Sequence, residues 1–275
     1  MAVLLALITA ASYGVGDFSG GLAARRAAPL SVTATAHALG LVGITLLAAL
    51  VGADLVRPAD LVLGSAGGAC GCLGVVLLYR GLASGRMAVV SPISAVVAAI
   101  VPVIGGLVSG ERPGPLAVLG IVAALVAIAL VSRSGPMGRP DPQSLLVALG
   151  SGLGFGAFFL LISGVHEEAG LWPLAIGRLT SVLIAGSFAM LRGLPVIVPR
   201  IALPLALAAG ALDVTANVTF LLATQHGLVS VVAVIASLYP AGTVLLAMVV
   251  TGERLSAAQG AGLAAAAAAL VLIAV

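Results

Sequence analysis

The sequence predicts an all-α polytopic membrane protein, with ten transmembrane helices arranged as two inverted five-helix repeats. Three observations lead to this prediction: an apolar composition, ten apolar runs of membrane-spanning length, and a phrase, Gly-Glu-Arg, that occurs twice in the same setting. Of 275 residues, 61% are hydrophobic and 8% are charged, whereas an ordinary soluble domain is about 45–50% apolar and about 25% charged. Such a chain is apolar on all sides, as helices embedded in lipid are.

Ten apolar runs have the length that crosses a bilayer. A hydrocarbon core about 30 Å thick needs about 20 helical residues. The runs are continuous rather than alternating, which favours helices over barrel strands of about 10 residues, and short connections rich in Gly, Pro and charged residues separate them. The predicted spans are residues 2–20, 30–52, 60–82, 88–108, 114–132, 144–164, 172–191, 201–224, 229–250 and 256–274.

The second half of the sequence repeats the first. Gly110-Glu111-Arg112 aligns with Gly252-Glu253-Arg254, each between the fourth and fifth spans of its half. Gly68 aligns in the same way with Gly210. The predicted repeats therefore cover nearly the whole chain, as residues 1–135 and 140–275.

Each predicted repeat holds five spans. Because five is odd, the second copy must enter the bilayer from the opposite side, which is the inverted-topology arrangement of secondary transporters, with a substrate site near the midplane between the halves. The two Gly-Glu-Arg phrases then lie at opposite membrane surfaces. Glu111 and Glu253 are predicted to be turn and cap residues, because each precedes a helix whose positive dipole end favours an anion.

These features resemble the drug/metabolite transporter superfamily, and within it the EamA-type ten-span transporters. Besides the two Gly-Glu-Arg phrases, the matching features are Pro173 followed by Arg178, and Tyr239-Pro240 ahead of Glu253. The first half departs from the pattern, with Ala34 where Arg178 would map and Pro102 one turn later than Pro240 would predict. The resemblance implies transport of an uncharged or zwitterionic metabolite, such as an amino acid or related solute.

Ionisable side chains inside the predicted spans are candidates for the substrate and proton cavity, because each costs a few kcal/mol to insert into the membrane. Asp213 shares one helical face with Asn217, which predicts a polar cavity wall; the alternative is a buried structural carboxyl group. A desolvated Asp213 is a candidate proton carrier between the two facing states. Asp17 is either a second cavity carboxyl group or a cap at the membrane interface.

Four further residues are candidates for the cavity, and two of them, Arg178 and His37, have alternative roles. Arg178 is predicted to pair with Asp213 or Asp17 or to bind a substrate carboxylate, unless it snorkels to the headgroups. His37 is either a hydrogen-bonded structural residue or a group that titrates near neutrality. Tyr13 and Tyr239 are aromatic candidates for an apolar substrate surface.

Three prolines predict bends in the fourth span of each half. Pro92 and Pro102 lie in the first half and Pro240 in the second. Proline removes a helix hydrogen bond, which a membrane protein tolerates where protein or a cavity satisfies the freed group. These stretches are predicted to be bendable cavity walls, with simple packing kinks as the alternative.

The function predicted is that of a secondary active transporter that moves a small-molecule substrate across the cytoplasmic membrane, coupled to protons or exchange. We expect a multi-pass monomer or homodimer in the lipid bilayer, with no cofactor, no metal, no nucleic acid and no enzymatic activity; the chain has no P-loop and no His-Glu-x-x-His. A channel or an accessory membrane subunit is the alternative, and an intramembrane enzyme is the least favoured. Orientation stays open, because the arginine distribution favours external termini and the resemblance implies internal ones.

Overall fold

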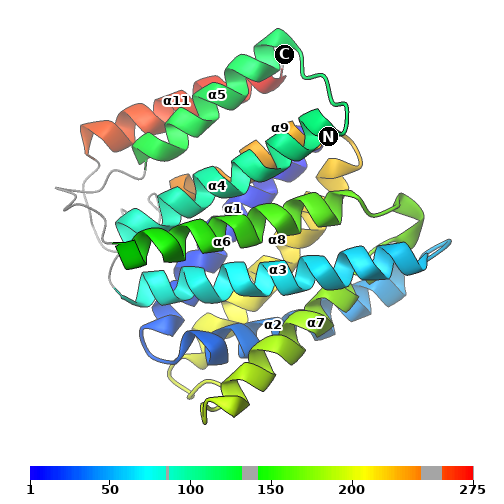
Figure 1. The fold of residues 1–275 in the computed structure, drawn as a ribbon, viewed down its shortest axis with the longest axis vertical. Helices are drawn as coiled ribbons and strands as arrows, with labels where there is room; N and C mark the ends of the chain where they lie inside the picture. The colour runs from blue at the N-terminus through cyan, green and yellow to red at the C-terminus, as the bar shows by residue number, and fades with distance from the viewer. Residues whose placement is uncertain (85–86, 132–141, 243–255, 275) are drawn as a thin grey trace.

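The computed structural model describes residues 1–84, 87–131, 142–242 and 256–274, and every regular element in these ranges is helical. Proline opens many of the helices, since its fixed φ suits the first turn and its missing N–H is not needed there. Figure 1 shows helices with these bounds: α1 (Ala2–Ala24), α2 (Pro29–Val51), α3 (Pro58–Ala83), α4 (Met87–Val108), α5 (Pro115–Val131), α6 (Pro142–Ser163), the short 3₁₀ helix η1 (Glu167–Ala169), α7 (Trp172–Leu191), α8 (Leu203–Thr224), α9 (Val229–Ala236) and α11 (Ala257–Ala274).

Six of these helices, α1, α2, α3, α6, α7 and α8, are long and apolar enough to cross a membrane. The remaining helices contain shorter apolar stretches at 93–108, 115–130, 229–242 and 260–273. Helices suit lipid because each satisfies its own backbone hydrogen bonds. The predicted fold class, an all-α polytopic membrane protein, is confirmed, and each predicted span contains a described helix.

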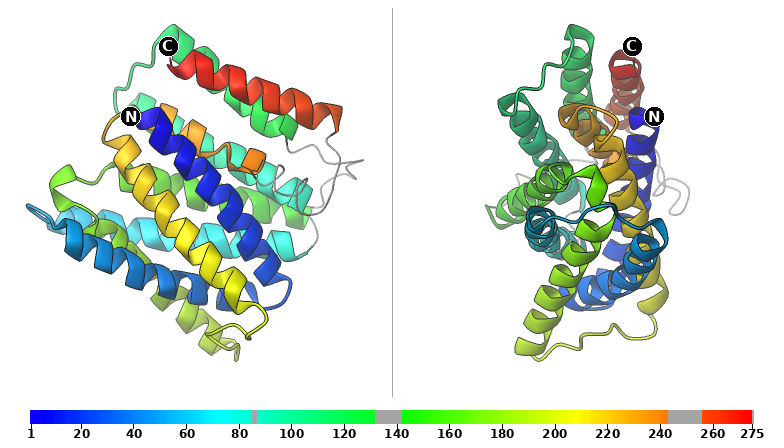
Figure 2. Two further views of the ribbon diagram at one scale, coloured as in Figure 1. Left: turned by 180° about the vertical axis from the view of Figure 1, so that it is seen from behind. Right: turned by 90° about the vertical axis from the view of Figure 1, so that its right-hand side faces the viewer.

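Helices from the two halves of the chain pack mainly against each other. Helix α1 lies along α8, and α3 lies along α6 (Figures 1 and 2). Helix α2 packs on α7 and α8, α3 also packs on α7, and α5 pairs with α11 at one edge of the molecule. The α1–α8 contact is matched by the α6–α3 contact when the halves are exchanged. This is the pairing that two related halves produce, although the predicted boundary at 135–140 lies outside the described residues.

Glycines allow close crossings between the halves, among them Gly68 and Gly210. A Cβ atom on Gly68 of α3 would lie 2.0 Å from the carbonyl oxygen of Gly177 in α7, and one on Gly210 of α8 would lie 2.2 Å from that of Ala36 in α2. Small residues let membrane helices approach closely enough for good van der Waals contact. The aligned pair Gly68 and Gly210 therefore has the same packing role.

The ninth predicted span, residues 229–250, is broken rather than continuous. Helix α9 ends at Ala236, two turn residues follow, and helix resumes at 239–242, so that Pro240 lies at the start of the second segment. The first-half equivalent, α4, continues through both Pro92 and Pro102. Proline fits the start of a helix because its missing N–H has no partner there, which accounts for the position of Pro240.

Glu111 lies in a turn, as predicted, but its side chain caps a different helix from the one that follows it. Its two carboxylate oxygens accept hydrogen bonds from the backbone N–H groups of Val229 (2.6 Å) and Ser230 (3.1 Å) at the start of α9. The expectation that it serves the helix it precedes is wrong, because the tertiary fold brings the first turn of α9 to this loop. Glu253 lies outside the described residues.

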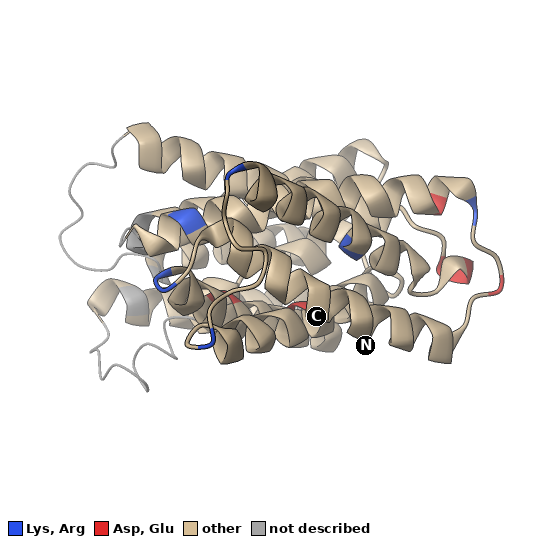
Figure 3. Cartoon of the chain, turned by 90° about the horizontal axis from the view of Figure 1, so that it is seen from below, with Lys and Arg blue, Asp and Glu red and all other residues tan. Residues whose placement is uncertain are grey.

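The two ends of the helical bundle differ in charge. Several acidic residues gather at one end, together with Arg57, and most of the described arginines lie toward the other end (Figure 3). The acidic end holds the α2–α3 and α6–α7 connections, with Asp54, Asp60, Glu167 and Glu168. The uneven distribution of arginines between the predicted connections therefore corresponds to an uneven distribution of the described arginines between the two ends of the bundle.

Candidate functional site

A cavity lies between six helices, three from each half of the chain. The space between the atoms there, including space open to solvent, is about 420 Å³. Helices α1, α2 and α3 contribute from the first half, and α6, α7 and α8 from the second. The residues that line it are Tyr13, His37, Gly68, Gly71, Cys72, Val75, Phe155, Phe158, Ile162, Leu174, Gly177, Arg178, Ser181, Asp213 and Asn217.

A chain of polar side chains crosses this cavity. Arg178 of α7 forms an ion pair with Asp213 of α8, and the two side chains are 10% and 19% exposed. The Asn217 amide donates a hydrogen bond to the same carboxylate at 3.1 Å. The Tyr13 hydroxyl of α1 in turn donates to the Asn217 carbonyl oxygen. A buried ion pair is strong only when its remaining polar atoms have hydrogen-bond partners. The hydrogen bonds made by Asn217 and Tyr13 therefore help to fix the geometry of the Arg178–Asp213 pair.

Close helix packing turns Arg178 inward. The preceding residue, Gly177, lies at the tight crossing with Gly68. The side chain then runs past Gly40 of α2, where a Cβ atom would lie 3.4 Å from the arginine Nε. Arg178 therefore meets Asp213 in the cavity, and the predicted alternative of snorkelling to the headgroups does not occur.

A second polar group lines the same cavity. The His37 Nδ1 and the Ser181 hydroxyl are hydrogen-bonded, and both side chains are buried. The Cys72 thiol donates to the Ser181 backbone carbonyl at 3.6 Å. Sequence reasoning missed Ser181, although its spacing of three residues from Arg178 places it on the same helical face.

Aromatic side chains form the apolar part of the site. Phe155 and Phe158 of α6 line the cavity. Phe159 stacks on Phe220 of α8 with ring centroids 4.4 Å apart, so Phe220 belongs to the core although it shares a helical face with Asp213. Offset aromatic contacts of this kind stabilise packing beyond their buried area.

Two predicted site residues, Asp17 and Tyr239, are not among the residues that line the cavity. The Tyr239 ring meets the Tyr13 ring edge-on at a centroid distance of 6.4 Å. Asp17 is half-buried in α1 and lies within electrostatic range of Asp213. Both residues therefore neighbour residues that line the cavity without lining it themselves.

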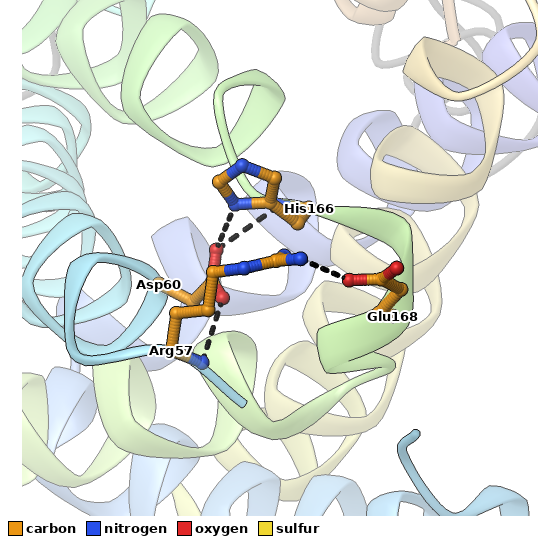
Figure 4. A network of polar contacts seen from close by, with 4 residues as sticks. All are labelled: Arg57, Asp60, His166 and Glu168. Atoms are coloured by element: carbon orange, nitrogen blue, oxygen red, sulfur yellow. Dashed lines mark hydrogen bonds and ion pairs between the residues drawn. The ribbon is translucent and has the colours of Figure 1, made fainter. Parts of the chain in front are cut away.

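A separate polar network lies at the acidic end of the bundle (Figure 4). The fully buried Asp60 carboxylate accepts hydrogen bonds from the backbone N–H groups of Arg57 (3.0 Å) and His166 (3.1 Å) and from the His166 ring (2.8 Å). Arg57 forms an ion pair with Glu168. The network joins the α2–α3 connection to the α6–α7 connection, so it ties the two halves together at that end. Within the described ranges, no group of three or more His, Cys, Asp or Glu side chains is placed to hold a metal ion.

Comparisons with known proteins agree with this architecture. Residues 1–133 match the family model described as "EamA-like transporter family". One similar solved structure, titled only "Crystal structure of protein", aligns with a TM-score of 0.75 over 98% of each chain at 16% sequence identity, a level that shows the fold alone. No curated protein sequence matches the chain.

Proposed function

We propose that this chain, whose first half belongs to the EamA-like transporter family over residues 1–133, is a secondary active transporter that works by alternating access. The observation that carries the proposal is the Arg178–Asp213 ion pair in a cavity lined by helices of both halves. Charged groups in the middle of membrane helices are unfavourable without a function or a partner. A cavity between two related helical units is also the place where alternating-access carriers bind substrate.

The cavity suits a small solute that has both polar and apolar parts. Arg178 is the donor group for a substrate carboxylate, since guanidinium groups bind carboxylates through two parallel hydrogen bonds. Phe155 and Phe158 offer an apolar surface in the same cavity. An amino acid or a related metabolite fits this combination, and the transport is coupled to protons or to exchange.

The carrier would act in the cytoplasmic membrane as a multi-pass monomer or homodimer without a cofactor. Its two halves, residues 1–135 and 140–275, would be inverted repeats, and the matched contacts made by Gly68 and Gly210 support this relation. In that arrangement Glu111 and Glu253 would have equivalent capping roles at opposite surfaces. The broken helix at 237–238 and the prolines of α4 are the segments proposed to bend as the cavity changes its exposure.

Counterflow in proteoliposomes tests the carrier proposal. Vesicles loaded with each of a panel of L-amino acids, sugars and cationic drugs should accumulate the labelled compound only where the carrier accepts it, and the flux should saturate. Arg178→Gln should abolish this counterflow, whereas Arg200→Gln, on an exposed loop, should leave it unchanged. Flux that rises linearly with concentration and shows no counterflow would instead indicate a channel.

A further inference from the structure

Two carboxyl groups lie in the helices around the cavity, and one guanidinium group lies beside them. Asp213 contacts that guanidinium directly, and Asn217 adds an N–H donor to the same carboxylate. Its negative charge is therefore balanced by Arg178 and by a hydrogen bond. A neighbouring cation and a hydrogen-bond donor both favour the ionised form of a carboxyl group.

Asp17 has a different environment. It lies on the face of α1 that also carries Tyr13 and Gly20, which are four residues before and three residues after it. The adjacent residue, Gly16, packs on α8, where a Cβ atom would lie 3.3 Å from the Cβ of Leu212 and 3.9 Å from the backbone nitrogen of Asp213. The backbone segments that carry the two acids therefore meet in the contact that joins the two halves, and the two acids lie within electrostatic range of each other.

The other titratable groups around Asp17 are the tyrosines. Tyr79 of α3 places its hydroxyl against Gly20, so that a Cβ atom there would lie 2.1 Å from it. Tyr13, Tyr79 and Tyr239 all lie within electrostatic range of Asp17. These are the three tyrosines of the chain, and all three are buried. A tyrosine side chain has no cationic form, so none of them balances the charge of a carboxylate.

The cations of this region lie elsewhere. His37 is hydrogen-bonded to Ser181, and its electrostatic neighbour is Arg178. In the part of the chain that the structure describes, the ion pairs join Arg57 to Glu168, His166 to Asp60 and Arg178 to Asp213, and none includes Asp17. Two ionised carboxylates beside one guanidinium would leave one uncompensated negative charge among apolar helices.

We propose that Asp17, rather than Asp213, is the proton-binding site of this protein, and that it holds a proton in the arrangement seen here. A carboxyl group that is partly withdrawn from water and has no cation in an ion pair with it favours the protonated form, and two neighbouring carboxyl groups do not both ionise readily. The protonation itself is a property of the folded protein, whereas its use to drive transport rests on the proposed carrier function.

The proton step couples directly to the contact between the halves. A proton from water forms an O–H bond on Asp17 when the cavity opens to one side, and that bond breaks when the cavity opens to the other side. Once the proton has left, Asp17 and Asp213 carry like charges across the α1–α8 contact and repel each other. The protonated form permits the close packing at Gly16, and the ionised form favours separation of α1 from α8.

Infrared spectroscopy of the purified full-length protein in lipid tests this assignment without a substrate. At pH 7 the wild-type protein should show the carbonyl stretch of a protonated carboxylic acid, and the band should shift in D₂O. Asp17→Asn should remove the band and Asp17→Glu should move it to the frequency of a protonated glutamic acid. Asp213→Glu should leave it in place, as should Asp54→Asn, which changes an exposed loop carboxylate. A band that moves in Asp213→Glu, or its absence from the wild type, would overturn the proposal.

Transport measurements separate this proposal from the carrier proposal. For any compound that gives counterflow, Asp17→Asn should keep counterflow and lose the extra accumulation that a pH gradient produces in the wild type. Gradient-driven accumulation that survives in full in Asp17→Asn would contradict a coupling role for Asp17. If no compound gives counterflow but the infrared band behaves as expected, the carrier proposal fails and the protonation of Asp17 stands.

Discussion

The two halves of the chain share their packing but not their charges. Gly68 in α3 and Gly210 in α8 make equivalent close crossings with α7 and α2. Three residues after each glycine stand Gly71 and Asp213, and both line the cavity. One position carries no side chain and the other carries the acid of the central ion pair.

This difference shows that helix packing and the placement of charged residues are subject to different constraints. Close helix crossings need small residues wherever they occur, so related halves keep them in both copies. A buried ion pair needs one acid and one base, and here Arg178 and Asp213 both come from the second half, with Ala34 at the first-half position that would match Arg178. The first half instead contributes Asp17, for which no equivalent acid occurs at Ala157.

The connections at the two ends differ in the same way. At the acidic end the halves are joined by the charged network around Asp60 (Figure 4). At the other end the α7–α8 connection meets the α1–α2 connection and helix α2 through neutral acceptors: Arg26 donates to the Ile201 carbonyl at 3.2 Å, and the Val198 N–H donates to the Thr35 hydroxyl of α2 at 3.1 Å. Charged groups therefore hold the two halves together at the acidic end, and hydrogen bonds to neutral acceptors hold them together at the other end.

The central ion pair should give the largest effect on stability. Arg178→Gln should lower the free energy of unfolding by about 3–5 kcal/mol, because it leaves Asp213 as a buried charge without its cation. The double variant Arg178→Gln/Asp213→Asn removes both charges and should recover most of this loss. Thermal unfolding of the purified protein in detergent measures both, and a double variant as unstable as the single one would contradict the interpretation.

The two glycine crossings should give the next largest effect. Gly68→Ala and Gly210→Ala should each cost about 3 kcal/mol, the upper end for overpacking, because the added methyl groups would overlap the carbonyl groups of Gly177 and Ala36. The control is Gly43→Ala in α2, where no atom lies within 4 Å of the Cβ position and helix propensity favours alanine by about 1 kcal/mol. Clearly unequal losses at the two crossings would break the equivalence of the halves.

The network at the acidic end should matter less. Asp60→Asn should lower the free energy of unfolding by about 1–3 kcal/mol, since the buried carboxylate loses charge and one acceptor atom becomes a donor. The exposed Asp54→Asn on the same connection is the matched control. Stability from chemical denaturation in detergent is the measurement, and equal values for the two variants would show that the network contributes nothing.

The Arg57–Glu168 ion pair should give the smallest effect. Its side chains are 35% and 50% exposed, and exposed ion pairs contribute about 0–1 kcal/mol. Arg57→Gln should therefore change stability by at most about 1 kcal/mol, and the change should shrink at high salt. A salt-independent loss that matches the loss in Asp60→Asn would indicate that the pair is part of the buried network.

The candidate site could be predicted only in part from the sequence. Asp213, Asn217, Arg178, His37 and Tyr13 stand out because polar groups within apolar helices are rare, and all five line the cavity. Ser181 and Cys72 carry no such signal, since small residues are common in membrane helices. The choice of partner for Arg178 was open between Asp213 and Asp17, and the packing of α7 against α2 and α3 directs it to Asp213.

Hydropathy and length determined the positions and the helical character of the apolar segments, because in lipid each segment must satisfy its backbone hydrogen bonds within itself. Each such segment can therefore be recognised without its neighbours. The break after Ala236, the capping of α9 by Glu111 and the different surroundings of Asp17 and Asp213 were decided by the tertiary structure. Each of these depends on which helices, far apart in the sequence, pack against one another. The local sequence around a residue does not specify that packing.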